Sequence, residues 1–475
     1  VLFPIALDKE EWGIIRFLPT IAIIVSNIAL FGAPQVLLKY MPSFKKGGKS
    51  NNGLLFYCLS ISLIVLGILI LLLLLFKSEF LDVYAENASR LSGYYNYLFP
   101  LIVLTVLTEL FSAFSRAHLF SVFQLFLREI LHRIVQSGLL AFLLFDLIDF
   151  NQFVLLYSFS QLFNLIFLLY FLWSEKILDV RPEKIESKRA RQMLKFGGAN
   201  FLTGLGATLT GRFDSLMIAA LVSGAAIVAA NGGLEAVAIY SFGAYIVTIV
   251  EMPARAVSSI ANGIVAKAWE ENDLEELSMI YRKTSLNQLL IGGLLFASIW
   301  SGIDELFELI GAYEEAKWIV LFLGLGKMII VISGSATSII VGSRHYLYIM
   351  YGMIMLAIIT FLLNLYFIPI YGVVGAAIAT LIALMIYYSL AFILLKIKFN
   401  LVPFTHKTIT LILVITISLL FANYIDFGLN PLLEIVVMVL IITTFYVSAI
   451  YILKISEDIN NTINNICRKI FSRTK

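Results

Sequence analysis

Ionisable side chains inside apolar stretches are the residues of this sequence that could do chemistry. The densest group is Arg128, Glu129, His132, Arg133 and Gln136, which at helical spacing share one face about 140 degrees wide. A charged face of this kind is costly to expose to hydrocarbon. Glu129 and Arg133 stand four residues apart and are expected to pair, which leaves Arg128 and His132 for a ligand. Because a guanidinium binds phosphate through two hydrogen bonds, the group predicts a site for an anionic substrate.

The second half of the chain holds further ionisable residues within apolar stretches. Arg212 and Asp214 lie deep in one stretch, Arg255 follows Glu251 by one helical turn, and Lys327 lies near the middle of another. Such residues mark transport pathways because a bare charge in the membrane is unfavourable. The predicted substrate-binding residues are Arg128, His132, Arg133, Arg212, Arg255 and Lys327, and the predicted ion-coupling residues are Asp214 and Glu251.

Simpler interpretations stand beside these. The residues from Arg128 to Arg133 also fit the cytoplasmic third of a helix, from which long cationic side chains extend to the membrane surface. Glu251 and Arg255 also fit a structural ion pair at a helix end. With Glu109 included, the intramembrane charges are balanced to slightly cationic, which favours an anionic substrate head.

Motifs for catalysis and for metal binding are absent from the sequence. Residues 47–50, Gly-Gly-Lys-Ser, resemble the end of a phosphate-binding loop, but Ser43 stands at the first glycine position and no strand precedes it. Cys58 and Cys467 are the two cysteines, one in an apolar stretch and one in the tail, so no disulfide or metal framework is expected. We expect a protein that is not an enzyme, has no cofactor or metal, and binds no nucleic acid.

The elements that must position these side chains are transmembrane helices. The 475 residues are 60% hydrophobic and 14% charged, a balance that soluble domains do not have over their whole length. Apolar runs of about 20 residues recur, which is the length that crosses a membrane as a helix. Run lengths and charged interruptions predict thirteen spans: 14–38, 54–76, 95–115, 120–147, 150–173, 196–222, 234–256, 284–303, 316–342, 346–368, 372–395, 408–426 and 431–453.

Lysine and arginine gather in alternate loops. Examples are the stretch 174–195 and the tail after residue 453, whereas the loop around 304–315 is acidic. The positive-inside rule places the basic loops in the cytoplasm. The sequence therefore predicts a cytoplasmic C-terminus.

The spans repeat. A shift of about 225 residues superimposes 54–76 on 284–303 and the following three spans on their counterparts, which indicates a parallel duplication. The span 196–222 finds no counterpart, so a first helix is expected to be missing and the native total to be fourteen. The expected all-α architecture is a bundle at 1–173, a cytoplasmic linker at 174–195, a second, pseudo-symmetric bundle at 196–395, a helix pair at 396–455 and an amphipathic tail at 456–475.

Several passages resemble a known family. They are Leu2-Phe3-Pro4 with Glu11-Trp12-Gly13, the stretch Phe126–Ile130, the stretch Tyr240–Pro253, and the stretch Ile264–Leu274. With the helix count, they make the chain similar to polysaccharide flippases of the O-antigen (Wzx) type. That family belongs to the superfamily that also holds multidrug and toxin extruders and the lipid II flippase.

The resemblance implies a function. A polyprenyl-pyrophosphate-linked oligosaccharide would be moved across the bacterial inner membrane by alternating access between the bundles, with its pyrophosphate on the cationic residues. Protons or sodium ions would drive the cycle through Asp214 or Glu251, and membrane lipid and polysaccharide assembly proteins are further expected partners. Two alternatives remain: an organic-cation antiporter of the same fold, which would need an acidic lumen, and a membrane enzyme acting on the lipid-linked saccharide, which would need a large outward loop.

Overall fold

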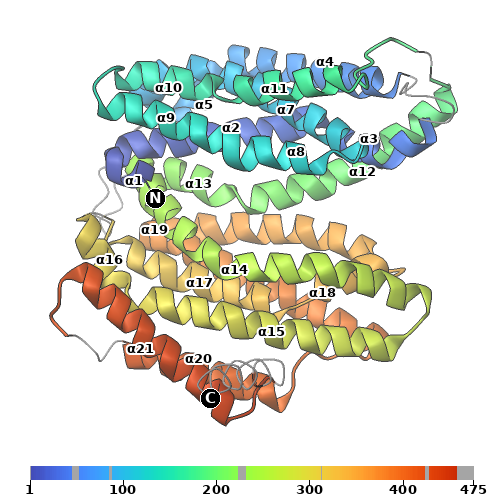
Figure 1. Cartoon of the computed structure of the whole chain (residues 1–475). Coiled ribbons are helices and arrows are strands. Elements are labelled where there is room, and N and C mark those ends of the chain that lie inside the picture. Colours follow the sequence, from blue (N-terminus) through green and yellow to red (C-terminus); the bar gives the residue numbers. More distant parts are fainter. Residues whose placement is uncertain are drawn as a thin grey trace, which may run out of the picture. The chain divides into compact units, whose positions relative to one another are not determined.

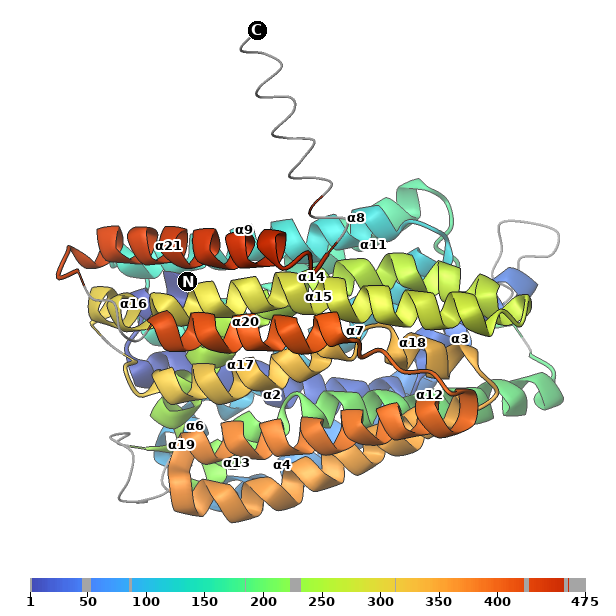
Figure 2. The same ribbon diagram turned by 90° about the horizontal axis from the view of Figure 1, so that it is seen from below.

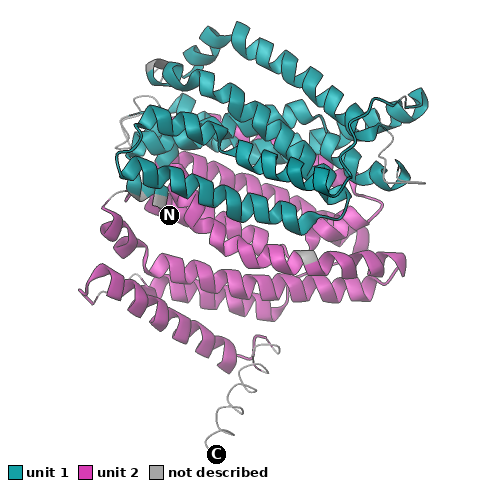
Figure 3. Cartoon of the chain, turned by 45° about the horizontal axis from the view of Figure 1, so that its top comes forward, with its two compact units in different colours: residues 1–238 teal, residues 239–475 magenta. Residues whose placement is uncertain are grey.

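The chain is all-helical wherever its structure is described. The computed structural model describes residues 2–44, 53–84, 88–183, 185–222, 232–311, 313–422, 427–456 and 460, and no strand occurs among them (Figure 1). Two compact units divide the chain, unit 1 from Val1 to Ala238 and unit 2 from Ile239 to Lys475 (Figure 3). The predicted tail at 456–475 lies outside the described residues except for Ser456 and Asn460.

The first long helix of unit 1 shows how local sequence sets a break. α2 (Lys9–Leu30) begins at Asp8, whose side chain accepts a hydrogen bond from Glu11 N at 2.6 Å in a capping box. Phe31 and Gly32 then adopt φ of 44° and 74° before α3 (Ala33–Phe44) begins. Only a glycine fits at 32, because an added Cβ would lie 2.1 Å from Gly197 O. The predicted span 14–38 is therefore two helices that meet at this break.

In unit 1, α7 (Leu98–Ala117) packs against α2, α3, α4 and α11. The others are α1 (Leu2–Ala6), α4 (Leu54–Leu75), α5 (Lys77–Val83), α6 (Ala88–Tyr94), η2 (Tyr95–Tyr97), α8 (Ser121–Phe126), η3 (Leu127–Leu131), α9 (His132–Leu144), α10 (Phe150–Phe159), α11 (Gln161–Ser174), α12 (Ser187–Thr210) and α13 (Phe213–Leu221).

Two helices after the predicted linker pack in unit 1. α12 begins at Ser187, inside the stretch 174–195 that the sequence indicates as linker, and packs on α2 and α3. α13 packs on α2. The boundary between the compact units consequently falls at Ala238, later than the boundary expected from the repeat. The predicted span 196–222 is interrupted at Gly211 and Arg212.

In unit 2 the central helix is α15 (Leu274–Ser301), which packs against α17 (Ala316–Ile332), α20 (His406–Ala422) and α21 (Pro431–Ile452). Lipid is as apolar as the core, so close fit rather than burial holds such helices together. A Cβ at Gly324 of α17 would lie 2.1 Å from the Phe296 ring, and Tyr446 donates its hydroxyl to Leu290 O at 2.9 Å. The predicted pair at 396–455 thus docks on the second bundle. The other helices are α14 (Gly233–Glu270), α16 (Ile303–Ile310), α18 (Ala336–Gly342) and α19 (Leu347–Phe399).

α19 is a helical hairpin rather than one rod. Gly372 has φ 58° and ψ −136°, a conformation open essentially to glycine alone. A Cβ at Gly375 would lie 2.1 Å from Phe367 O, so the two arms meet tightly at the bend. Figure 2 shows the orange helix turning back on itself, in agreement with the two predicted spans 346–368 and 372–395.

The described helices are those of a polytopic membrane protein. Seven are long and apolar enough to cross a membrane, and nine if each of two bent pairs is one span. The remaining predicted spans coincide with shorter or broken helices, such as α8 to α9 and α12 to α13, or share the hairpin α19.

Candidate functional site

The first cluster of charged side chains lies in unit 1, where a helix changes its winding. α8 continues through the π-helical turn η3 into α9, and π turns in α-helices are frequent at functional sites. Glu129 lies on this turn and accepts two hydrogen bonds. Arg128 Nε donates to Oε1 at 3.1 Å, and Arg133 donates through a terminal nitrogen to Oε2 at 2.8 Å.

This η3 cluster of Arg128, Glu129 and Arg133 keeps one positive charge in excess. The predicted Glu129–Arg133 pair is confirmed, but the expectation that Arg128 has no protein partner is wrong. Arg128 turns its guanidinium onto the carboxylate oxygen that Arg133 does not use. Each guanidinium has five N–H donors and uses one here, and the two arginine side chains are 54% and 72% exposed. Both retain donors for an anion.

A small polar cavity adjoins the cluster. It measures about 70 Å³ and lies between α7, α8, η3, α9 and α11, with Glu109, Arg128 and His132 in its wall. Three buried polar atoms of wall residues have no hydrogen-bond partner among the described residues: Thr108 Oγ1, His132 Nδ1 and Asn164 Oδ1. Buried polar atoms normally have partners, and a cavity of this size holds water. His132 therefore faces an enclosed polar space, with its Nε2 3.0 Å from Gln136 Nε2.

The second cluster lies in unit 2 between α14 and α17. Glu251 again stands between two cations: its Oε2 is 2.6 Å from Lys327 Nζ, and Arg255 Nε donates to its Oε1 at 3.1 Å. The exposed fractions are 15% for Glu251, 26% for Lys327 and 63% for Arg255. The sequence predicts the Glu251–Arg255 pair, whereas the third member comes from a helix 76 positions away. This α14–α17 cluster also carries one positive charge in excess.

Arg212 and Asp214 lie at the break between α12 and α13. Arg212 is the residue that caps α13, with φ −131°, and Asp214 is in the first turn with 6% exposure. The N-terminus of a helix favours a negative charge, so this turn is a suitable place for a buried carboxylate. Interrupted membrane helices occur where backbone lines a cavity or a binding site.

The structure brings the predicted residues together in three places: the η3 cluster with its cavity, the α14–α17 cluster, and the α12–α13 break. It adds residues that we did not predict, chiefly Thr108, Asn164 and Gln161 of the cavity wall. Their signal in the sequence is a polar side chain within an otherwise apolar span. Among the described residues, no group of three or more His, Cys, Asp or Glu side chains is arranged to hold a metal ion.

Comparison with known proteins identifies the family of this chain. The profile of a family described as polysaccharide biosynthesis protein matches residues 1–269. No curated protein matches the sequence.

Solved structures of low sequence identity share the fold. The lipid II flippase MurJ in an inward closed conformation aligns over 95% of this chain and 94% of its own, with TM-score 0.70 and 14% identity. An inward-facing multidrug resistance MATE transporter of the MOP superfamily aligns over 83% and 92%, with TM-score 0.64 and 15% identity. A MOP superfamily transporter from Pyrococcus furiosus, described as having a binding pocket of reversed polarity, aligns over 84% and 89%, with TM-score 0.56 and 14% identity.

Proposed function

Since this chain belongs to the polysaccharide biosynthesis protein family and has the fold of MurJ and the MATE transporters, we propose that it is a flippase. Its proposed substrate is a polyprenyl-pyrophosphate-linked oligosaccharide, moved by alternating access across the bacterial inner membrane for surface polysaccharide such as O-antigen. The alternation of basic and acidic loops supports a cytoplasmic C-terminus. Polysaccharide assembly proteins are proposed as further partners.

The observation that carries this proposal is the charge of the two clusters. Each unit holds one carboxylate between two cations inside or beside its apolar helices. Such a cluster is stable without ligand because each cation has a partner, yet it has a net attraction for a multivalent anion. The pyrophosphate of a lipid-linked sugar is an anion of this kind.

Ligand binding at the α14–α17 cluster would require an exchange of partners. Both oxygens of Glu251 are engaged, one by Lys327 and one by Arg255. A pyrophosphate that takes these cations leaves Glu251 without them, and an unpaired charge in the membrane is unfavourable. A proton or a sodium ion arriving at Glu251 would offset that cost, so substrate and ion would bind together.

Asp214 is the second proposed ion-coupling residue. It is buried at the start of α13, and Arg212 precedes it by two residues. A change of ionisation there would alter the balance of charge at a helix break. A break is the kind of place where two halves of a helix can change their relative position, which gives ion binding a structural consequence.

An antiporter for organic cations is the second candidate function, favoured by the MATE likeness alone. An organic cation needs a negatively charged site, whereas the η3 and α14–α17 clusters each carry excess positive charge. The Pyrococcus furiosus transporter has the same fold and is described as having a binding pocket of reversed polarity. The fold alone therefore does not fix the polarity of the pocket. The charge of the clusters therefore favours the anionic substrate.

Reconstituted transport tests the proposal. Proteoliposomes with a fluorescent lipid-linked oligosaccharide should show its movement between leaflets, and Arg255→Gln should slow that movement. The matched control is Lys267→Gln, because Lys267 of α14 is exposed and also pairs with a carboxylate four residues later, that of Glu271 just after the helix ends. Transport of an organic cation, with no movement of the lipid-linked sugar, would replace the flippase with the antiporter.

A further inference from the structure

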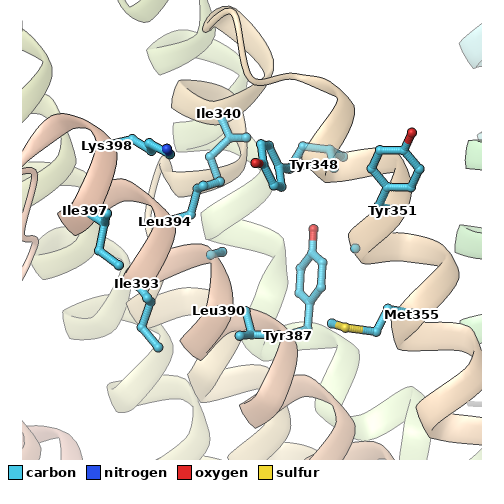
Figure 4. A pocket seen from close by; sticks show the side chains of 13 residues that line it. Ile340, Tyr348, Tyr351, Met355, Tyr387, Leu390, Ile393, Leu394, Ile397 and Lys398 are labelled. Carbon is cyan, nitrogen blue, oxygen red and sulfur yellow. The ribbon is translucent and has the colours of Figure 1, made fainter.

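An apolar crevice in unit 2 shares no wall residue with the α14–α17 cluster. It measures about 450 Å³ and is formed by the end of α18 and the two arms of α19, with Ile349, Met355, Leu390 and Leu394 in its wall (Figure 4). Several wall residues are exposed at its mouth, among them Ile397 at 73%. Its volume falls within the range of about 300–1,000 Å³ that small-ligand pockets occupy.

One hydroxyl group is buried in this crevice without a partner. Tyr387 is 5% exposed, and its hydroxyl has no hydrogen-bond partner among the described residues. Figure 4 shows Tyr387 extending this hydroxyl from the floor toward the level of Tyr348. A buried donor without an acceptor is unfavourable, so a ligand that offers an oxygen at this depth would satisfy it.

The rim of the crevice carries positive charge. Lys398 lines it, on the opposite side from Tyr351. The loop before α19 lies against the end of the same hairpin, because the rings of His345 and Phe399 are 5.7 Å apart. This brings Arg344 to the same end as Lys398, on the side that the lysine and arginine pattern predicts to be cytoplasmic.

We propose that this crevice binds one anionic phospholipid of the cytoplasmic leaflet. An acyl chain fills the apolar wall, Lys398 binds the phosphate, and the Tyr387 hydroxyl donates to an ester oxygen. At roughly 30 Å³ for each water-sized group, the volume accommodates about 15 chain atoms, which suits one acyl chain. Basic crevices between helices on the cytoplasmic side bind acidic head groups in this way.

The lipid-linked substrate fits the crevice less well. A single lysine in the wall matches the single charge of a phosphodiester, whereas a pyrophosphate carries more charge. A polyprenyl chain is also several times longer than the crevice can hold. The crevice therefore suits a different ligand from the one proposed for the transport site. Lipid binding to it can be measured without a transport assay, so the two proposals are tested separately.

Native mass spectrometry of the purified, delipidated full chain tests the proposal. Phosphatidylglycerol should bind to the wild-type protein in preference to phosphatidylcholine, and Lys398→Gln should weaken phosphatidylglycerol binding about fivefold, the effect of one basic residue near an anionic membrane surface. Lys396→Gln is the matched control, since Lys396 is exposed on the same arm but is not part of the wall. It should bind as the wild type does.

A second variant separates the site from general surface charge. Ala391→Trp fills the crevice and should remove the preferred phosphatidylglycerol while Lys398 stays in place. Tyr387→Phe should bind more weakly than the wild type without unfolding, as size-exclusion chromatography would verify. Equal binding by the wild type, Lys398→Gln and Tyr387→Phe would overturn the proposal. Displacement of phosphatidylglycerol by an equimolar polyprenyl phosphate would also overturn it, in favour of the substrate's own chain.

Discussion

Replacing Lys327 by glutamine tests whether the α14–α17 cluster meets the substrate. Glutamine keeps a hydrogen-bond donor for Glu251, from which Lys327 Nζ is 2.6 Å away, so the packing of α14 and α17 should survive. The variant loses only the positive charge of the lysine. A hydrogen bond to a charged group contributes about 1.5–3 kcal/mol, which corresponds to about a 10- to 150-fold change in binding.

The lower end of this range is expected, because Glu251 already offsets part of the lysine charge and the side chain is 26% exposed. The transport efficiency of Lys327→Gln in proteoliposomes should fall about tenfold, and Lys327→Arg should restore most of it. The control Lys267→Gln breaks an exposed pair at the C-terminal end of α14, which is worth about 0–1 kcal/mol, and should change little.

Glu251→Gln probes the same cluster from the other side. Removing the carboxylate leaves two cations without their partner, so the affinity for the anionic substrate should rise while ion-dependent transport slows. Equal transport by Lys327→Gln and Lys267→Gln, together with unchanged affinity in Glu251→Gln, would show that the cluster is a structural ion pair and would refute the reasoning.

Three further predictions concern single positions. Arg128→Gln should slow transport more than Arg116→Gln, measured in the same proteoliposomes, because Arg128 lies in a cluster with excess charge. Gly372→Ala should lower stability by about 1–3 kcal/mol, since alanine is strained at φ 58°; a thermal shift in detergent measures it, and no shift would contradict the hairpin. Asn164→Leu should reduce transport in the same proteoliposomes, because Asn164 Oδ1 lines the polar cavity without a protein partner among the described residues and leucine removes an acceptor for the water that the cavity holds; unchanged transport would contradict a role for this water.

The positions of the spans followed from the sequence because apolar run length is a local property. The breaks were harder to predict. Gly32 and Gly372 are glycines like many others in these helices. Gly32 is distinguished by its contact with the backbone of Gly197, and Gly372 by the turn of the α19 hairpin. Gly211 precedes Arg212 within an apolar run, so the interruption of that span was also hidden.

The candidate site divides in the same way. Helical spacing was enough to predict Glu129 with Arg133 and Glu251 with Arg255, because residues four apart lie on one face. Helical spacing did not predict the pairing of Lys327 with Glu251, because these residues meet only when α14 and α17 pack together. The π turn was likewise invisible, and it is the turn that carries Glu129.

That π turn has a consequence for how the chain tolerates insertions and deletions. A helix with one π turn holds an additional residue between the same two ends. Deleting one residue within 127–131 should therefore give a regular α-helix. The side chains before and after the deletion should still point in their present directions. The same deletion elsewhere in 121–144 would rotate every later side chain by about 100 degrees. Functional chains of this family that are one residue shorter in this helix are expected to have lost that residue here.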